Sequence, residues 1–116
     1  MLLIVDADPH WRELLREFFE MNSFRVTVSG TANESFRAMN DSIALVITDP
    51  AFTDHGAAEL IRGIHNSTNI PPQILVCGNG RIPIEVSKMI HSKLPKPVAL
   101  SLLLSEVIRL LDPPPP

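Results

Sequence analysis

Four side chains with distinct chemistry stand at or directly after the ends of short apolar runs. Asp6, Asp49 and Cys77 each end such a run, and Lys96 follows a much shorter one. If these runs are parallel strands of one open sheet, their carboxyl ends meet at one edge, which is where such sheets bind ligands. The sequence therefore predicts that two carboxylates, a thiol and an ammonium group converge from distant positions.

Two carboxylates held close together repel each other, so a proton, a cation or a lysine must balance their charge. Lys96 can supply one positive charge. A hard divalent cation such as Mg²⁺ also suits this place, because it keeps several waters and accepts one or two carboxylates. A phosphate would complete such a site.

The elements that must position these residues are short apolar strands alternating with amphipathic helices. Continuous apolar runs of this kind are typical of strands buried on both faces. The predicted strands are residues 2–5, 24–28, 43–48 and 73–77 with a very short one near 94, and the predicted helices are 9–22, 31–39, 56–64, 83–92 and 100–111. The alternation predicts an α/β fold in which helices cover both faces of a parallel sheet through right-handed crossovers.

Two helix starts carry capping signals. Asp8 precedes Pro9, so we interpret Asp8 as the N-cap of the first helix, with a displaced metal ligand as the alternative. Thr31 with Glu34 three residues later forms a capping box for the second helix.

Composition excludes several function classes. The chain has 116 residues, the size of one domain, and a net charge of −3, which offers no field to attract nucleic acid. The first apolar run is too short for a membrane span and has no basic residue before it, so we expect neither a signal peptide nor a membrane segment. The lone cysteine cannot form an internal disulfide, which favours a cytoplasmic location.

The chain resembles the receiver domain of response regulators (CheY-like) over about residues 1–112, with 113–116 as a proline-rich tail or linker. The matching segments are Leu3-Ile4-Val5-Asp6, Leu45-Val46-Ile47-Thr48-Asp49 with Gly56 and Glu59-Leu60, Ile74-Leu75-Val76-Cys77-Gly78, and Leu94-Pro95-Lys96-Pro97. The resemblance implies a flavodoxin-like, doubly wound five-stranded sheet in the order 2-1-3-4-5. It implies a module of two-component signalling that is not a dedicated enzyme.

The same resemblance implies roles for individual residues. Asp49 would accept a phosphoryl group from a histidine kinase or phosphotransfer protein, Asp6 would belong to the acidic pocket, and Lys96 would pair with the phosphoryl group. Mg²⁺ would be held by Asp6, Asp49 and the backbone carbonyl of Ala51.

Several positions depart from the family pattern. Ala7 stands where a second acidic residue is usual, so we expect Mg²⁺ to bind weakly. Cys77 replaces a threonine or serine and Lys93 an aromatic residue, which removes both parts of the usual switch. The segment 50–55 is one residue short, with Thr53 where proline is usual. The resemblance is therefore to a degenerate receiver.

Other interpretations stay open. Asp49 before Pro50 can begin a turn, Lys96 can be a solvated lysine, and Cys77 suits a buried small residue better than a redox sensor. His10, His55, His65 and His91 lack metal-ligand spacing on one face, and we expect them at the surface.

Two further functions compete with phosphorylation. A pseudo-receiver would dock partners or form a homodimer without phosphate, through residues 86–93 and the outer side of 98–111. A distant alternative is a haloacid-dehalogenase-like phosphohydrolase, with Asp6 as nucleophile, Asp8 as acid/base, and Thr48 and Lys96 binding phosphate.

Overall fold

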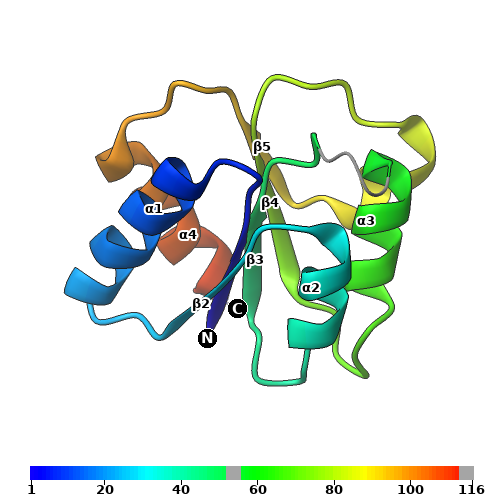
Figure 1. Cartoon of the computed structure of the whole chain (residues 1–116), viewed down its shortest axis with the longest axis horizontal. Coiled ribbons are helices and arrows are strands. Elements are labelled where there is room, and N and C mark those ends of the chain that lie inside the picture. The colour runs from blue at the N-terminus through cyan, green and yellow to red at the C-terminus, as the bar shows by residue number, and fades with distance from the viewer. Residues whose placement is uncertain (52–55, 113–116) are drawn as a thin grey trace.

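The computed structural model describes residues 1–51 and 56–112 and shows a five-stranded parallel sheet (Figure 1). Its strands are β1 (Leu2–Val5), β2 (Val26–Ser29), β3 (Leu45–Thr48), β4 (Gln73–Cys77) and β5 (Ser92–Leu94). They lie in the order β2-β1-β3-β4-β5, which confirms the predicted fold class and strand order. The predicted tail, 113–116, lies outside the described residues, as do Thr53 and His55.

Helices cover both faces of the sheet. Helices α1 (Pro9–Met21) and α4 (Leu100–Leu111) lie on one face, and α2 (Ala32–Ala38) and α3 (Ala57–His65) lie on the other (Figure 1). A 3₁₀ helix, η1 (Ile84–Met89), packs beside α3. Each face has its own hydrophobic cluster, one around Phe19 and Leu103 and the other around Leu60 and Ile64.

The register of the central strands places the candidate residues side by side. Val5 pairs with Thr48 across β1 and β3, so Asp6 and Asp49 both follow at the same edge. The Asp49 N–H donates to the carbonyl of Val5 at 3.2 Å, which extends this pairing past the end of β3. The two carboxylates are therefore neighbours, as the sequence predicts.

Both predicted caps are present. The Asp8 carboxylate accepts from the backbone N–H groups of His10 and Trp11, and Pro9 is the first residue of α1. The Thr31 hydroxyl accepts from the Glu34 N–H at 3.1 Å. Satisfying these otherwise unpaired donors fixes where α1 and α2 begin.

Two boundaries in the first half of the chain differ from the prediction. Strand β2 begins at Val26 because the Phe24 N–H donates back to the Phe19 carbonyl at 3.0 Å. The Phe24 ring also packs edge-on against Phe19, with centroids 5.6 Å apart. Phe24 thus closes the end of α1 instead of starting the strand. Strand β3 begins at Leu45, since the Ile43 N–H donates to Asn40 in a turn.

The predicted helix 83–92 was wrong in type and length. Residues Ile84–Met89 form a 3₁₀ helix, with bonds from Val86 to Pro83 and from Ile90 to Ser87. The chain then turns into β5, because the His91 N–H donates to the Ile74 carbonyl at 2.8 Å. Strand β5 therefore starts at Ser92, earlier than predicted.

This change also corrects the predicted docking face. Val86 is fully buried and packs in the cluster around Leu60, so it cannot lie on an exposed surface. Ile84, which the prediction did not include, is 89% exposed. Among the described residues, no helix is both long and apolar enough to cross a bilayer.

Candidate functional site

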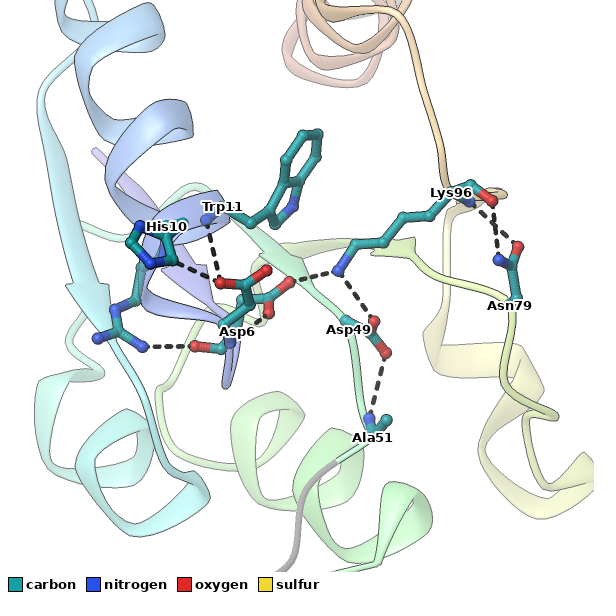
Figure 2. A network of polar contacts seen from close by, with 9 residues as sticks. Asp6, His10, Trp11, Asp49, Ala51, Asn79 and Lys96 are labelled. Carbon is teal, nitrogen blue, oxygen red and sulfur yellow. Dashed lines mark hydrogen bonds and ion pairs between the residues drawn. The ribbon is translucent and has the colours of Figure 1, made fainter.

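The ammonium group of Lys96 bridges the two carboxylates at the carboxyl edge of the sheet (Figure 2). Lys96 Nζ lies 2.8 Å from Asp6 Oδ2 and 3.0 Å from Asp49 Oδ2. The side chains are partly shielded, with 7% of Asp6, 20% of Asp49 and 25% of Lys96 exposed. The structure thus brings together three residues from positions far apart in the chain, and Asp49 does more than begin a turn.

Backbone groups orient each carboxylate. The Asp8 N–H donates to Asp6 Oδ1 at 2.9 Å, and the Ala51 N–H donates to Asp49 Oδ1 at 3.2 Å. The Arg12 guanidinium donates to the carbonyl of Asp6 at 2.7 Å, which anchors the main chain at the end of β1. Every carboxylate oxygen of the pair therefore has a hydrogen-bond donor.

The environment of Lys96 favours its charged form. Burial lowers the pKa of the Lys96 amine, but hydrogen bonds to Asp6 and Asp49 and the charges of both carboxylates outweigh burial and raise the pKa above its ordinary value. The ammonium also lies 5.5 Å from the centroid of the Trp11 ring, a cation–π arrangement. Lys96 is thus a permanent positive charge at the site, not a solvated strand-end lysine.

Cys77 lies in the interior beneath this edge, with 1% of its surface exposed. Burial raises the pKa of its thiol to about 11; nearby Lys96 opposes this shift, and Asp6 and Asp49 add to it. The thiol is therefore protonated at neutral pH and is a poor nucleophile. This agrees with the interpretation of Cys77 as a buried small residue.

The site offers few oxygen ligands for Mg²⁺. Asp6 and Asp49 can offer carboxylate oxygens, but Ala7 has none to offer, and Lys96 already binds both. Among the described residues, no group of three or more histidine, cysteine or acidic side chains gathers in one place. Because Mg²⁺ sites of one or two carboxylates depend on water and phosphate oxygens, the residues suit a weak site that a phosphoryl group completes.

The phosphohydrolase alternative finds little support. Asp8 Oδ1 caps α1, because it accepts from the backbone N–H of His10 at 2.9 Å and from the backbone N–H of Trp11 at 3.4 Å. The Thr48 hydroxyl is buried and has no hydrogen-bond partner in the described structure. Asp8 is therefore occupied as a cap, as predicted, and Thr48 is in no position to bind phosphate at the surface.

Sequence reasoning missed several residues around Lys96. The Asn79 carboxamide binds the main chain of Lys96 (Figure 2), and Trp11 contacts its ammonium. Asp8, Trp11, Lys96 and Pro97 line a pocket of about 310 Å³ beside the carboxylates. The Gly78-Asn79-Gly80 sequence signalled a loop, but nothing in it indicated that Asn79 would reach Lys96.

The histidines follow the prediction only in part. His10 is exposed, but His65 is half-buried with a buried, unpartnered Nδ1. His91 Nδ1 accepts from the Ile74 N–H at 3.0 Å, at the opposite edge of the sheet from the carboxylates. His91 is exposed, as expected, although its ring accepts this hydrogen bond, whereas His65 is less exposed than the surface prediction implies.

Comparison with known proteins finds a curated relative and solved structures that are similar to this chain. No family model matches the chain. It is 30% identical over 115 residues to the C4-dicarboxylate transport transcriptional regulatory protein DctD of Pseudomonas aeruginosa, a match that covers 96% of this chain and 25% of DctD. The chain thus spans about a quarter of the length of this curated relative.

Solved structures share the fold. The non-phosphorylated HemR receiver domain from Leptospira biflexa matches with a TM-score of 0.85 and 21% identity, covering 99% of this chain and 96% of that domain. The signal receiver domain of a LuxO repressor homologue from Vibrio parahaemolyticus matches with a TM-score of 0.81 and 16% identity, over 95% and 88% of the two chains. At these identities the likeness concerns the fold.

Proposed function

We propose that this receiver domain of the two-component response-regulator type accepts a phosphoryl group on Asp49. The observation that carries this proposal is the Lys96 ammonium shared between Asp6 and Asp49. It places a positive charge beside the Asp49 carboxylate, where a phosphoryl group would gain negative charge.

The step needs only groups that the site holds and a phosphorylated donor. An oxygen of Asp49 forms a bond to phosphorus while the bond from phosphorus to the donor nitrogen of a phosphohistidine breaks. The electron pair leaves with the imidazole, which departs neutral because its other ring nitrogen carries a proton, and an acyl phosphate remains on Asp49. Lys96 can then transfer its hydrogen bond from the carboxylate to a phosphoryl oxygen, because its flexible stem allows the movement.

Asp6 and Asp49 would hold Mg²⁺ together with oxygens of the phosphoryl group, and the ion would neutralise charge there. Asp6 also keeps Lys96 beside the site while Asp49 is modified, since Lys96 Nζ binds both carboxylates.

Receiver domains in two-component systems interact with histidine kinases or phosphotransfer proteins, and we propose this class of donor for the chain. The proposal places the domain in the cytoplasm, where the buried thiol of Cys77 would stay reduced.

The experiment is phosphorylation with acetyl phosphate and Mg²⁺, followed by intact mass. The native chain should gain one phosphoryl group that hydroxylamine removes, as expected for an acyl phosphate. The Asp49→Asn variant should gain none, and Asp112→Asn, an exposed acidic residue after α4, should behave like the native chain. An adduct that persists in Asp49→Asn would rule out Asp49 as the acceptor.

A second candidate is a docking module that works without phosphate, and Lys93 favours it. Lys93 occupies the place of the usual aromatic switch residue, is exposed, and donates to the Gly80 carbonyl at 3.0 Å. A homodimer through η1, β5 and α4 is one form of this function. Sedimentation with and without beryllofluoride and Mg²⁺ tests it: a dimer that forms equally in both conditions supports docking without phosphate.

A further inference from the structure

The segment that carries Lys96 can form few main-chain hydrogen bonds. Strand β5 ends at Leu94, whose carbonyl accepts the last sheet hydrogen bond from the Gly78 N–H at 2.9 Å. Prolines stand on both sides of Lys96, at 95 and 97, and proline has no backbone N–H. The Lys96 N–H is therefore the only main-chain donor in residues 95–97.

Asn79 binds both main-chain polar groups of Lys96. The Lys96 N–H donates to Asn79 Oδ1 at 3.1 Å, and Asn79 Nδ2 donates to the Lys96 carbonyl at 2.8 Å. The carboxamide thus pairs with Lys96 as a neighbouring strand would, beyond the end of the sheet (Figure 2). An alanine at residue 79 lacks the carboxamide and would remove both of these hydrogen bonds to the main chain of Lys96.

The position of this main chain decides where the ammonium group lies. Lysine has a flexible four-carbon stem with three rotatable donors, so its charged end is only as well placed as its backbone and its partners. Lys96 Nζ binds Asp6 and Asp49 at its far end, while Asn79 binds the backbone at its near end. The two ends are held by different elements of the fold.

We propose that Asn79 is a positioning residue for Lys96, fixing the main chain from which the ammonium group reaches Asp6 and Asp49. The inference deepens the proposed phosphorylation of Asp49 and rests on it for the effect on rate, but the effect on Lys96 itself can be measured without phosphate. It assigns a function to the loop after β4.

The test compares three variants of the full chain. Asn79→Ala removes both bonds, and Asn79→Asp keeps an acceptor for the Lys96 N–H but loses the donor to its carbonyl. Asn69→Ala, in the exposed loop before β4, is the matched control. The first readout is the NMR signals of the Lys96 side chain, and the second is the fluorescence of Trp11, the single tryptophan, whose ring centroid is 5.5 Å from Lys96 Nζ.

Asn79→Ala should shift the Lys96 signals and change Trp11 emission, with a smaller change in Asn79→Asp and none in Asn69→Ala. Labelling of Asn79→Ala by acetyl phosphate should slow by about tenfold, because misplacing a charged group by a fraction of an ångström weakens catalysis strongly. If Asn79→Ala does not fold, Asn79→Asp tests the inference: shifted Lys96 signals support it, and unchanged Lys96 signals overturn it.

Unchanged Lys96 signals in a folded Asn79→Ala variant would overturn the inference, even if labelling slowed. Shifted Lys96 signals in a chain whose Asp49 never takes up phosphate would uphold the positioning role and contradict the proposed phosphorylation instead. The two proposals therefore fail in distinguishable ways.

Discussion

The main chain of Gly78 lies directly against the carboxylate of Asp49. A Cβ atom at Gly78 would come within 2.7 Å of Asp49 Cγ and Oδ1 and within 2.9 Å of Oδ2. Real Cβ atoms are essentially never that close to another atom, so any side chain at residue 78 must displace the carboxylate. Gly78 has an ordinary φ, and its role is therefore to make room for Asp49.

The first prediction concerns this contact. Gly78→Ala should move the Asp49 carboxylate away from its position on Lys96 and slow phosphorylation by acetyl phosphate about tenfold. Gly80→Ala is the matched control, because a Cβ there meets no atom within 4 Å. The measurement is the rate of adduct formation by intact mass. Equal rates for Gly78→Ala and the native chain would mean that the carboxylate can shift without loss.

The second prediction concerns the missing acidic residue. Ala7→Asp adds a third carboxylate next to Asp6, and affinity at oxygen-ligand sites rises with the number of charged ligands. Mg²⁺ should therefore bind the variant roughly tenfold more tightly. Titration calorimetry of both proteins measures the difference. An unchanged affinity would show that residue 7 does not face the carboxylate pair.

Much of the fold could be predicted because its signals are local. The buried strands read as continuous apolar runs, and Asp8 and Thr31 mark helix starts by side-chain capping. The convergence of Asp6, Asp49 and Lys96 followed from one topological rule, that parallel strands end at the same edge. These features depend on sequence neighbours or on the whole sheet, and both are visible in a sequence.

The features that could not be predicted depend on particular contacts that leave no periodic signal in the sequence. Phe24 joins the end of α1 because it packs on Phe19, although its type suits a strand. The helix before β5 is a short 3₁₀ turn because the backbone of His91 is drawn into pairing with Ile74. Asn79 lies in a loop that gives no periodic signal, so its bonds to Lys96 appear only in three dimensions.

The third prediction concerns His91 and pH. His91 Nδ1 accepts from the Ile74 N–H, so this bond requires an unprotonated Nδ1. Burial lowers the pKa of His91 from its ordinary value of 6.5, and the nearby His65 lowers it further. The unfolded chain therefore binds the proton more tightly than the folded one. The stability that His91 contributes is present above about pH 6.5 and is lost as the pH falls toward the lowered pKa.

Urea unfolding at several pH values measures this effect. His91→Asn keeps an acceptor near the Ile74 N–H but cannot titrate, so its free energy of unfolding should depend less on pH below about pH 6.5. His10→Asn replaces an exposed histidine on α1 and should keep the native pH dependence. If His91→Asn has the same pH dependence as the native chain, His91 is not the titrating group.

The last prediction concerns how far phosphorylation of Asp49 is transmitted. A thiol is a weak hydrogen-bonding group, so the buried Cys77 offers little to a phosphoryl oxygen. Lys93 is exposed, and its ammonium already donates to Gly80 instead of filling an apolar slot. A ligand shifts a conformational equilibrium only by its difference in affinity for the two states. Beryllofluoride with Mg²⁺ should therefore change amide signals near Asp49 and Lys96 and leave η1, β5 and α4 almost unchanged.

The double variant Cys77→Thr with Lys93→Tyr restores both side-chain types that the receiver resemblance implies. When beryllofluoride binds the double variant, the changes in amide signals should extend into residues 83–111. Each single variant should respond like the native chain, because the hydroxyl and the aromatic side chain are both needed to transmit the change. Asp49→Asn in the double variant is the control and should abolish the extended changes. A large, Asp49-dependent rearrangement of residues 83–111 in the native chain would contradict the prediction, since an ordinary phosphorylation switch would then operate without either group.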